Sequence, residues 1–144
     1  MEQMSTCPFC RRMSSGTVDL RHASAVALPD AFPLSPGHTL VVPTRHTASV
    51  ATLSEEELAD LWKLTRRCVN ALTRLMKPDG FNIGINLGRV AGAGVVEHLH
   101  IHVVPRWNGD TNFMPVLAET RVIVEHLHAA WRKIRSGFAE QRAT

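Results

Sequence analysis

His98, His100 and His102 occupy every second position of an otherwise apolar run. Because alternate residues of a strand point to the same side, a strand over residues 98–104 would place the three imidazoles on one face, about 6.6 Å apart along the strand. Imidazoles need hydrogen-bond partners when they are buried, so three of them on one face have little structural use. The pattern therefore indicates a chemical role for this face.

Three interpretations of these histidines follow from their chemistry. They could form a polar, solvent-facing side of a strand, or they could bind a metal ion, although a strand would hold the third ring away from an ion bound by the other two. A neutral imidazole can also attack phosphorus and form a phosphoramidate, which water or another acceptor then cleaves. In that case His100 would be the nucleophile, because the rings on either side could orient it and protonate the leaving group.

Cys7 and Cys10 form a C-x-x-C pair, while Cys68 lies alone in a helical pattern. In a reducing compartment such a pair indicates metal or redox chemistry. No thioredoxin-like strand–helix–strand pattern follows it, and a tetrahedral zinc site would need two further ligands, for which imidazoles are suited. We expect Cys68 to be a small buried apolar residue.

Composition limits the class of protein. The 144 residues suit one domain, and the formal charge of +3 comes without a long basic block or any Tyr, so we expect no nucleic-acid partner. No apolar run approaches the ~20 residues of a membrane helix, and the first residues lack the apolar segment of a signal peptide. These features predict a soluble cytoplasmic protein that does not associate with membranes.

Periodicity and turn signals predict the elements that would position these residues. Ser54 and Glu57 form a capping box that begins a helix, which ends before Pro78. Strands are expected over residues 18–28 (one or two), 39–42, 81–87 and 98–104, with a glycine-rich loop at 88–94 and a second amphipathic helix within 119–138. This order favours an α+β domain with an antiparallel sheet and helices packed on one face.

Several segments resemble one known family. The segment 98–104, H-L-H-I-H-V-V, resembles the H-φ-H-φ-H-φ-φ signature of the histidine-triad (HIT) superfamily. The segment 36–43, P-G-H-T-L-V-V-P, is similar to the family's P-G-H-x-L-V-x-P strand, and 81–88 is similar to the strand before its phosphate loop. The stretch 105–113 looks most like the bacterial branch of diadenosine tetraphosphate hydrolases and phosphorylases. The resemblance covers residues 7–113 and is specific, because several matches occur in the right order.

The resemblance implies a HIT-like homodimer with one domain over 1–144, whose core spans about 7–113 and is followed by a helical extension at about 119–138. It implies an enzyme that cleaves adenine nucleotides, such as diadenosine tetraphosphate, at the α-phosphate through a nucleotidyl-histidine. The implied catalytic residues are His100 as nucleophile with His38, His98 and His102, and the implied nucleotide-binding residues are Asp30, Asn86, Gly94 and Val95. Some HIT proteins complete a structural zinc site with two histidines, which by resemblance would here be His46 and His98; a metal-free site with reduced thiols is the alternative. No organic cofactor is expected.

Alternatives remain at several of these positions. Asp30 could simply form a turn after Pro29, and the glycines of 88–94 could only permit positive φ. The amide that many hydrolytic members carry four residues before the first triad histidine is replaced here by Gly94, which could admit inorganic phosphate as the acceptor. A nucleotide-binding module with little turnover, or a zinc-stabilised redox or structural protein, are the other candidate functions. The remaining histidines are expected at the surface; they are His22, His126 and His128.

Overall fold

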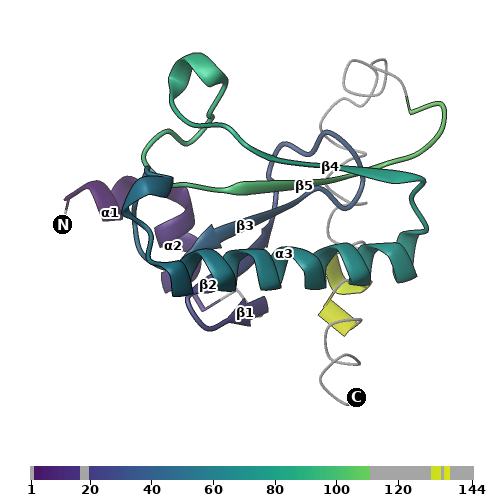
Figure 1. Cartoon of the computed structure of the whole chain (residues 1–144), viewed down its shortest axis with the longest axis horizontal. Coiled ribbons are helices and arrows are strands. Elements are labelled where there is room, and N and C mark those ends of the chain that lie inside the picture. The colour runs from purple at the N-terminus through teal and green to yellow at the C-terminus, as the bar shows by residue number, and fades with distance from the viewer. Residues whose placement is uncertain (1, 17–19, 111–130, 134, 137–144) are drawn as a thin grey trace.

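The computed structural model describes residues 2–16, 20–110, 131–133, 135 and 136. Its centre is a five-stranded sheet with the order β1-β2-β3-β5-β4, in which all neighbouring strands are antiparallel (Figure 1). The strands are β1 (Leu20–His22), β2 (Ala25–Pro29), β3 (Thr39–Pro43), β4 (Gly80–Ile85) and β5 (Ile101–Arg106). The helices are α1 (Glu2–Thr6), α2 (Pro8–Ser14) and α3 (Glu55–Met76), with short 3-10 turns at η1 (Val50–Thr52) and η2 (Arg89–Ala91). The predicted α+β class and antiparallel sheet are confirmed.

Helix α3 begins and ends where the sequence indicates. The Ser54 hydroxyl accepts from the Glu57 backbone N–H, and the Glu57 carboxylate accepts from the Ser54 N–H, which completes the capping box. Lys77 ends the helix in the left-handed region with φ 48°. Cys68 is fully buried on this helix, and burial raises the pKa of its thiol to about 12, as expected for a residue that acts as a small apolar side chain.

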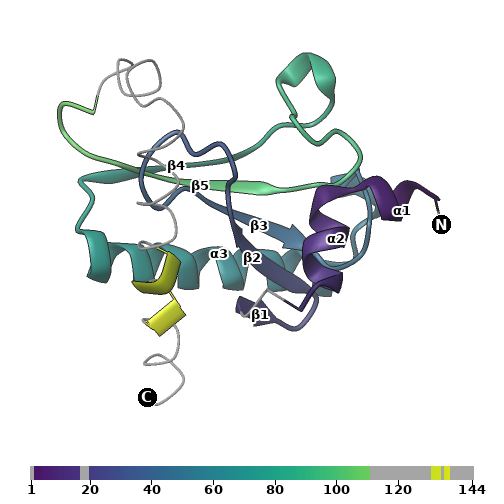
Figure 2. The same ribbon diagram turned by 180° about the vertical axis from the view of Figure 1, so that it is seen from behind.

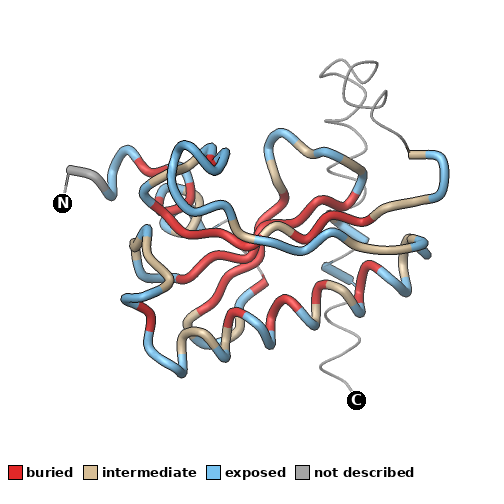
Figure 3. Tube along the Cα trace, turned by 45° about the horizontal axis from the view of Figure 1, so that its top comes forward, coloured by how far each residue is buried: buried red, intermediate tan, exposed pale blue. Residues whose placement is uncertain are grey.

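Helices cover both faces of the sheet, so the expectation that they would all pack on one face is wrong. The first face, called the α3 face, packs Ala25, Ala27, Val41, Ile101 and Val103 against α3. The second, called the α2 face, packs Val26, Leu28, Leu40 and Val42 against Cys7, Phe9 and Cys10. Figure 2 shows α2 on the side of the sheet away from α3. Because both faces are covered, β2 and β3 are buried along their whole length, whereas β4 is largely exposed (Figure 3).

Strand β5 begins later than predicted, at Ile101 rather than at His98. The residues before it leave the ladder, because the Leu99 N–H donates to the Thr47 carbonyl at 2.7 Å instead of to a neighbouring strand. The alternation of side chains nevertheless continues through residues 98–103. Leu99, Ile101 and Val103 enter the core of the α3 face, which leaves the three histidines on the α2 face.

The predicted second amphipathic helix at 119–138 falls mostly outside the described residues. Of its expected apolar positions, Trp131 is described and packs against the core of the α3 face. In the described part of the chain, no helix is both long enough and apolar enough to cross a membrane.

Candidate active site and metal centre

Five side chains of the predicted site meet on the α2 face. His102 lies within β5 and pairs in register with Leu40 of β3, which also belongs to that face. His38 lies one residue before β3, Asp30 one residue after β2, and His98 and His100 on the approach to β5. The ring centroids of His100 and His102 are 4.9 Å apart. The rings are thus closer together than the expected spacing of about 6.6 Å along the strand.

The hydrogen bond of His100 leaves one ring nitrogen free for chemistry. Its Nδ1 lies 2.9 Å from the carbonyl oxygen of His98. A carbonyl can only accept, so Nδ1 carries the proton and Nε2 carries the lone pair. His100 is only 4% exposed, and the rings of Phe9 and His102 pack against it at centroid distances of 5.2 and 4.9 Å. The arrangement presents an imidazole whose Nε2 lone pair can act as a nucleophile.

His38 and His102 share a proton whose position is fixed by the backbone. The Leu34 N–H donates to His38 Nδ1 at 3.0 Å, so the ring proton of neutral His38 is on Nε2. That nitrogen lies 3.0 Å from His102 Nδ1 and 3.3 Å from the Asp30 carboxylate. His102 therefore accepts at Nδ1 and keeps its own proton on Nε2, as a hydrogen-bond donor.

Burial keeps these two rings neutral. It lowers the pKa of His38 to about 4, with smaller contributions from His102 and His100, while the charge of Asp30 acts in the opposite direction. Burial also lowers the pKa of His102, helped by His100 and opposed by Asp30. Near pH 7 His38 and His102 are therefore both neutral beside Asp30.

Asp30 forms the turn that the sequence left open and also contacts a histidine, while its role in nucleotide binding stays a prediction. Its Oδ1 accepts the Phe32 N–H at 2.9 Å, which forms a turn, and its Oδ2 contacts His38. Donor atoms of Asp30, His38 and His102 lie within 4.8 Å of one another, a spacing that would suit a metal ion. However, the proton that Leu34 fixes on His38 Nε2 occupies the lone-pair direction that a metal would need, so the cluster is suited to sharing a proton.

A separate group of four side chains has the donors and spacing of a tetrahedral metal site. Cys7, Cys10, His46 and His98 place their ligand atoms within 4.8 Å of one another. His98 Nδ1 is 3.4 Å from Cys7 Sγ, 3.6 Å from Cys10 Sγ and 3.2 Å from His46 Nδ1, and Cys10 Sγ is 3.4 Å from His46 Nδ1. A tetrahedral zinc ion bound at about 2.3 Å by sulfur and about 2.0 Å by nitrogen separates its ligand atoms by about 3.3–3.8 Å. The four side chains fit such an ion.

The second ring nitrogen of His98 supports this assignment. Its Nε2 lies 2.9 Å from the Pro43 carbonyl and must donate to it, which turns the lone pair of Nδ1 toward the two cysteines. Burial, together with the neighbouring Cys7, raises the pKa of the Cys10 thiol to about 11. Metal binding would therefore have to displace the Cys10 proton.

Comparison with known proteins decides the family. The HIT domain matches residues 15–109 of this chain. The chain belongs to the HIT family.

This HIT protein is 37% identical to the AP-4-A phosphorylase of Mycobacterium tuberculosis over 126 residues. The matched region covers 88% of this chain but only 65% of the relative's length. It is 32% identical to the adenosine 5'-monophosphoramidase of Schizosaccharomyces pombe, covering 72% of this chain and 74% of the relative. A zinc-bound histidine triad family protein from Mycobacterium smegmatis superposes with a TM-score of 0.76 at 28% identity, covering 97% and 98% of the two chains.

The remaining predicted nucleotide-binding residues of the HIT domain lie on the loop between β4 and β5. Asn86 is exposed, and its amide donates to the Gly92 carbonyl of its own loop at 3.5 Å. Gly94 has open space where a side chain would project, and Val95 packs against the apolar cluster of the α2 face. The hydrogen bond of the Asn86 amide is made within its own loop, and the role of Asn86 as a phosphate ligand stays a prediction.

Three residues at the site were missed by sequence reasoning. Phe9 contacts the rings of His98 and His100, Leu34 fixes the proton of His38, and Arg12 donates to the Pro29 carbonyl at 3.0 Å beside Asp30. Phe9 lies between the two predicted cysteine ligands, which was a usable signal. Leu34 acts through its backbone N–H, so its side-chain type carried none.

Proposed function

We propose that this HIT protein transfers an adenine nucleotide through a covalent intermediate on His100. The observation that carries the proposal is the hydrogen bond from His100 Nδ1 to the His98 carbonyl, which leaves the lone pair of this buried imidazole on Nε2. Two relatives support an adenine nucleotide as the substrate class, because their names refer to adenosine compounds. They are the AP-4-A phosphorylase and the adenosine 5'-monophosphoramidase.

The chemistry has two balanced steps. His100 Nε2 attacks the α-phosphorus, a P–N bond forms and the bond from phosphorus to the leaving oxygen breaks. The released polyphosphate departs as an anion, and the Nε2–H of His102 stabilises its developing charge by a hydrogen bond, while His38 holds His102 in the correct tautomer. An acceptor oxygen then attacks phosphorus, the P–N bond breaks with its electron pair returning to Nε2 of His100, and the proton of a water acceptor is released to solvent.

We propose inorganic phosphate as the acceptor, with water as the alternative. The open space around Gly94 leaves room for an anion on the loop that precedes the histidines, and the AP-4-A phosphorylase is 37% identical to this chain. Phosphate would convert the nucleotidyl-histidine formed from diadenosine tetraphosphate into ADP, with ATP as the leaving group. Water would give AMP and ATP instead.

The decisive experiment incubates the protein with a panel of adenine nucleotides, including diadenosine tetraphosphate and adenosine phosphoramidate, with and without millimolar phosphate. Products are identified by chromatography, and acid-quenched protein is analysed by mass spectrometry for adenylylated His100. ADP and ATP that appear only with phosphate support the phosphorylase, whereas AMP and ATP in all samples identify a hydrolase. Nucleotide binding without products or adduct would identify a binding module and refute the enzyme.

We further propose that the Cys7, Cys10, His46 and His98 group holds a structural zinc ion. The donor set, the ligand spacing and the zinc-bound HIT neighbour support this assignment. The ion would supply folding free energy, because the unfolded chain has no preformed site. In this proposal the zinc ion has a structural role, and the histidines carry out the reaction.

A homodimer is the assembly that we propose for the chain. Strand β4 is at the edge of the sheet, and one of its side chains, Ile83, is 41% exposed. An exposed edge of this kind can pair with a second copy of the same strand.

A further inference from the structure

Phe9 lies between the metal-binding group and the proposed nucleophile. It lies between Cys7 and Cys10 in the sequence, directly before Cys10, and it is only 6% exposed. Its ring packs edge-on against His98 at a centroid distance of 5.5 Å and an interplanar angle of 89°. It packs against His100 at 5.2 Å and 61°. One side chain thus contacts a candidate metal ligand and the nucleophile at once.

The orientation of the His100 ring has to be set by its neighbours. The torsion that rotates an imidazole about its Cβ–Cγ bond has broad minima, and a half-turn would exchange the places of Nδ1 and Cδ2 and those of Nε2 and Cε1. The hydrogen bond to the His98 carbonyl selects one orientation, and the rings of His102 and Phe9 enclose the imidazole at 4.9 and 5.2 Å. Nucleophilic attack is sensitive to displacements of about 1 Å, which can cost about 100-fold in rate.

Phe9 in turn depends on the two cysteines beside it. Helix α2 has seven residues, too few to be stable without tertiary contacts. Its buried contacts are concentrated in Cys7, Phe9 and Cys10, which pack on the α2 face. A metal ion that joins both cysteines to His46 and His98 would fix the backbone on either side of Phe9.

We infer that Phe9 is a positioning residue for His100, and that the metal-binding group controls the nucleophile by holding Phe9 against it. The inference rests on the proposed function, because His100 must be the nucleophile. Loss of the metal or of the Phe9 ring frees the His100 imidazole to rotate. The nucleotide pocket around Asp30 and His38 stays in place, so the covalent step slows while nucleotide binding persists.

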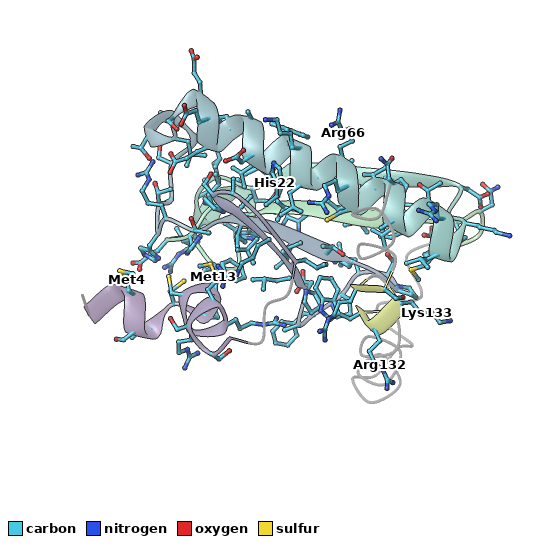
Figure 4. The ribbon with its side chains drawn as sticks, turned by 90° about the horizontal axis from the view of Figure 1, so that it is seen from below. Met4, Met13, His22, Arg66, Arg132 and Lys133 are labelled. Atoms are coloured by element: carbon cyan, nitrogen blue, oxygen red, sulfur yellow. The ribbon has the colours of Figure 1, made fainter. Side chains whose placement is uncertain are left out.

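The test compares Phe9→Ala with Met13→Ala, which shortens another apolar side chain of α2 that packs in the same cluster (Figure 4). We expect both variants to bind one zinc per chain and to bind AMP within about 3-fold of the unmodified protein. Rapid-quench measurement of His100 adenylylation should show a loss of about 10-fold or more in Phe9→Ala only. The ¹⁵N spectrum of His100 should show one tautomer in the unmodified protein and in Met13→Ala, and a mixture in Phe9→Ala. Phe9→Leu, which restores apolar volume, should recover most of the rate.

The metal arm uses the same readouts. Chelator-treated protein should show the mixed His100 tautomer and the slow covalent step, and added zinc should restore both in the unmodified protein and in Met13→Ala but not in Phe9→Ala. Equal rates and spectra for Phe9→Ala and Met13→Ala would overturn the inference, as would a Phe9→Ala defect confined to KM, which would make Phe9 a wall of the nucleotide pocket. If Phe9→Ala does not fold, the chelated and the zinc-restored samples of the unmodified protein and of Met13→Ala carry the comparison. If the unmodified protein forms no adduct, the proposed function fails, and the tautomer spectra still decide whether Phe9 orients His100.

Discussion

Single backbone groups determine which nitrogen of each imidazole is available. The His98 carbonyl binds Nδ1–H of His100, and the Pro43 carbonyl binds Nε2–H of His98. The Leu34 N–H binds the lone pair of His38. As a result, the free nitrogen of His98 is Nδ1, which is directed to the cysteines, whereas the free nitrogen of His100 is Nε2. This selection lets alternating histidines belong to two different side-chain clusters.

Replacing His100 by Asn tests its role as the nucleophile. The variant should lose the covalent intermediate and several orders of magnitude in kcat, because no other described group on this face is placed to form it. AMP affinity should change by less than about 10-fold, since Asp30, His38 and His102 remain. The control is His22→Asn, a histidine beside α3 whose ring is 3.7 Å from Asp60 (Figure 4). Turnover by His100→Asn above about a tenth of the unmodified rate, a barrier change under about 1.4 kcal/mol, would assign the nucleophile elsewhere.

Stability should depend on pH through His38. Burial lowers its pKa in the folded protein to about 4, whereas the unfolded chain titrates near the ordinary value of 6.5. Between these values the unfolded state binds more protons, so this contribution is complete above pH 6.5 and is lost as the pH falls toward 4. We expect the decrease in unfolding free energy from pH 8 to pH 5 to be about 1–2 kcal/mol smaller in His38→Gln. Urea titrations at both pH values measure it, with His22→Gln as control. An identical decrease in His38→Gln would mean that His38 is not held neutral by the fold.

At the scale of elements, the sequence predicted what local patterns control. The Ser54–Glu57 capping box and the apolar period of α3 are local, and both ends of that helix were predicted correctly. The start of β5 was wrong because it depends on a hydrogen bond between Leu99 and Thr47, which are remote in sequence. The position of α2 on the opposite face was also missed, because seven residues are too few for a recognisable period.

The candidate site divides in the same way. Residue type and spacing alone indicated the three alternating histidines and the C-x-x-C pair as candidate site residues, because these residue types are rare and reactive. Family resemblance added Asp30, His38 and His46, which the structure brings to the expected clusters. The place of Phe9 between the two cysteines indicated that it lies near a site, but its contacts with His98 and His100 arise only when α2 folds onto the sheet.

Helix α2 should depend on the metal for its place on the sheet. Protein purified without chelators should contain one zinc per chain, and removal of zinc should lower the thermal midpoint, because binding free energy contributes directly to folding. Elemental analysis and scanning calorimetry with and without chelator measure both effects. Cys7→Ser should lose zinc, whereas Cys68→Ala should retain it, since Cys68 is buried in the core of the α3 face. A fully active, zinc-free preparation would show that the four side chains assemble without a metal.

At the scale of the whole molecule, the two faces of the sheet differ in what they carry. Its α3 face carries the larger apolar core, while the α2 face carries both side-chain clusters that could do chemistry. Residues alternate between these roles along β5, where Ile101 and Val103 are in the core and His102 is in the site. A shift of one residue in the register of β5 would exchange the two sets. The pairing of β5 with both β3 and β4 therefore fixes the site as well as the fold.

The exposed edge of β4 predicts the assembly of the protein. Because β4 is the last strand of the sheet, the backbone groups on its outer side have no strand partner among the described residues. Two copies that pair β4 with β4 across a two-fold axis would satisfy these groups and would cover Ile83 and Leu87, which are 41% and 48% exposed. Analytical ultracentrifugation should then give twice the mass of one chain.

Ile83→Lys places two like charges near the axis and should shift the protein to monomers, with the His100 and metal clusters intact. Trp62→Lys, at a position 52% exposed on α3, is the control and should remain dimeric. A monomeric unmodified protein, or an Ile83→Lys variant that dimerises as strongly, would mean that this edge is not the interface.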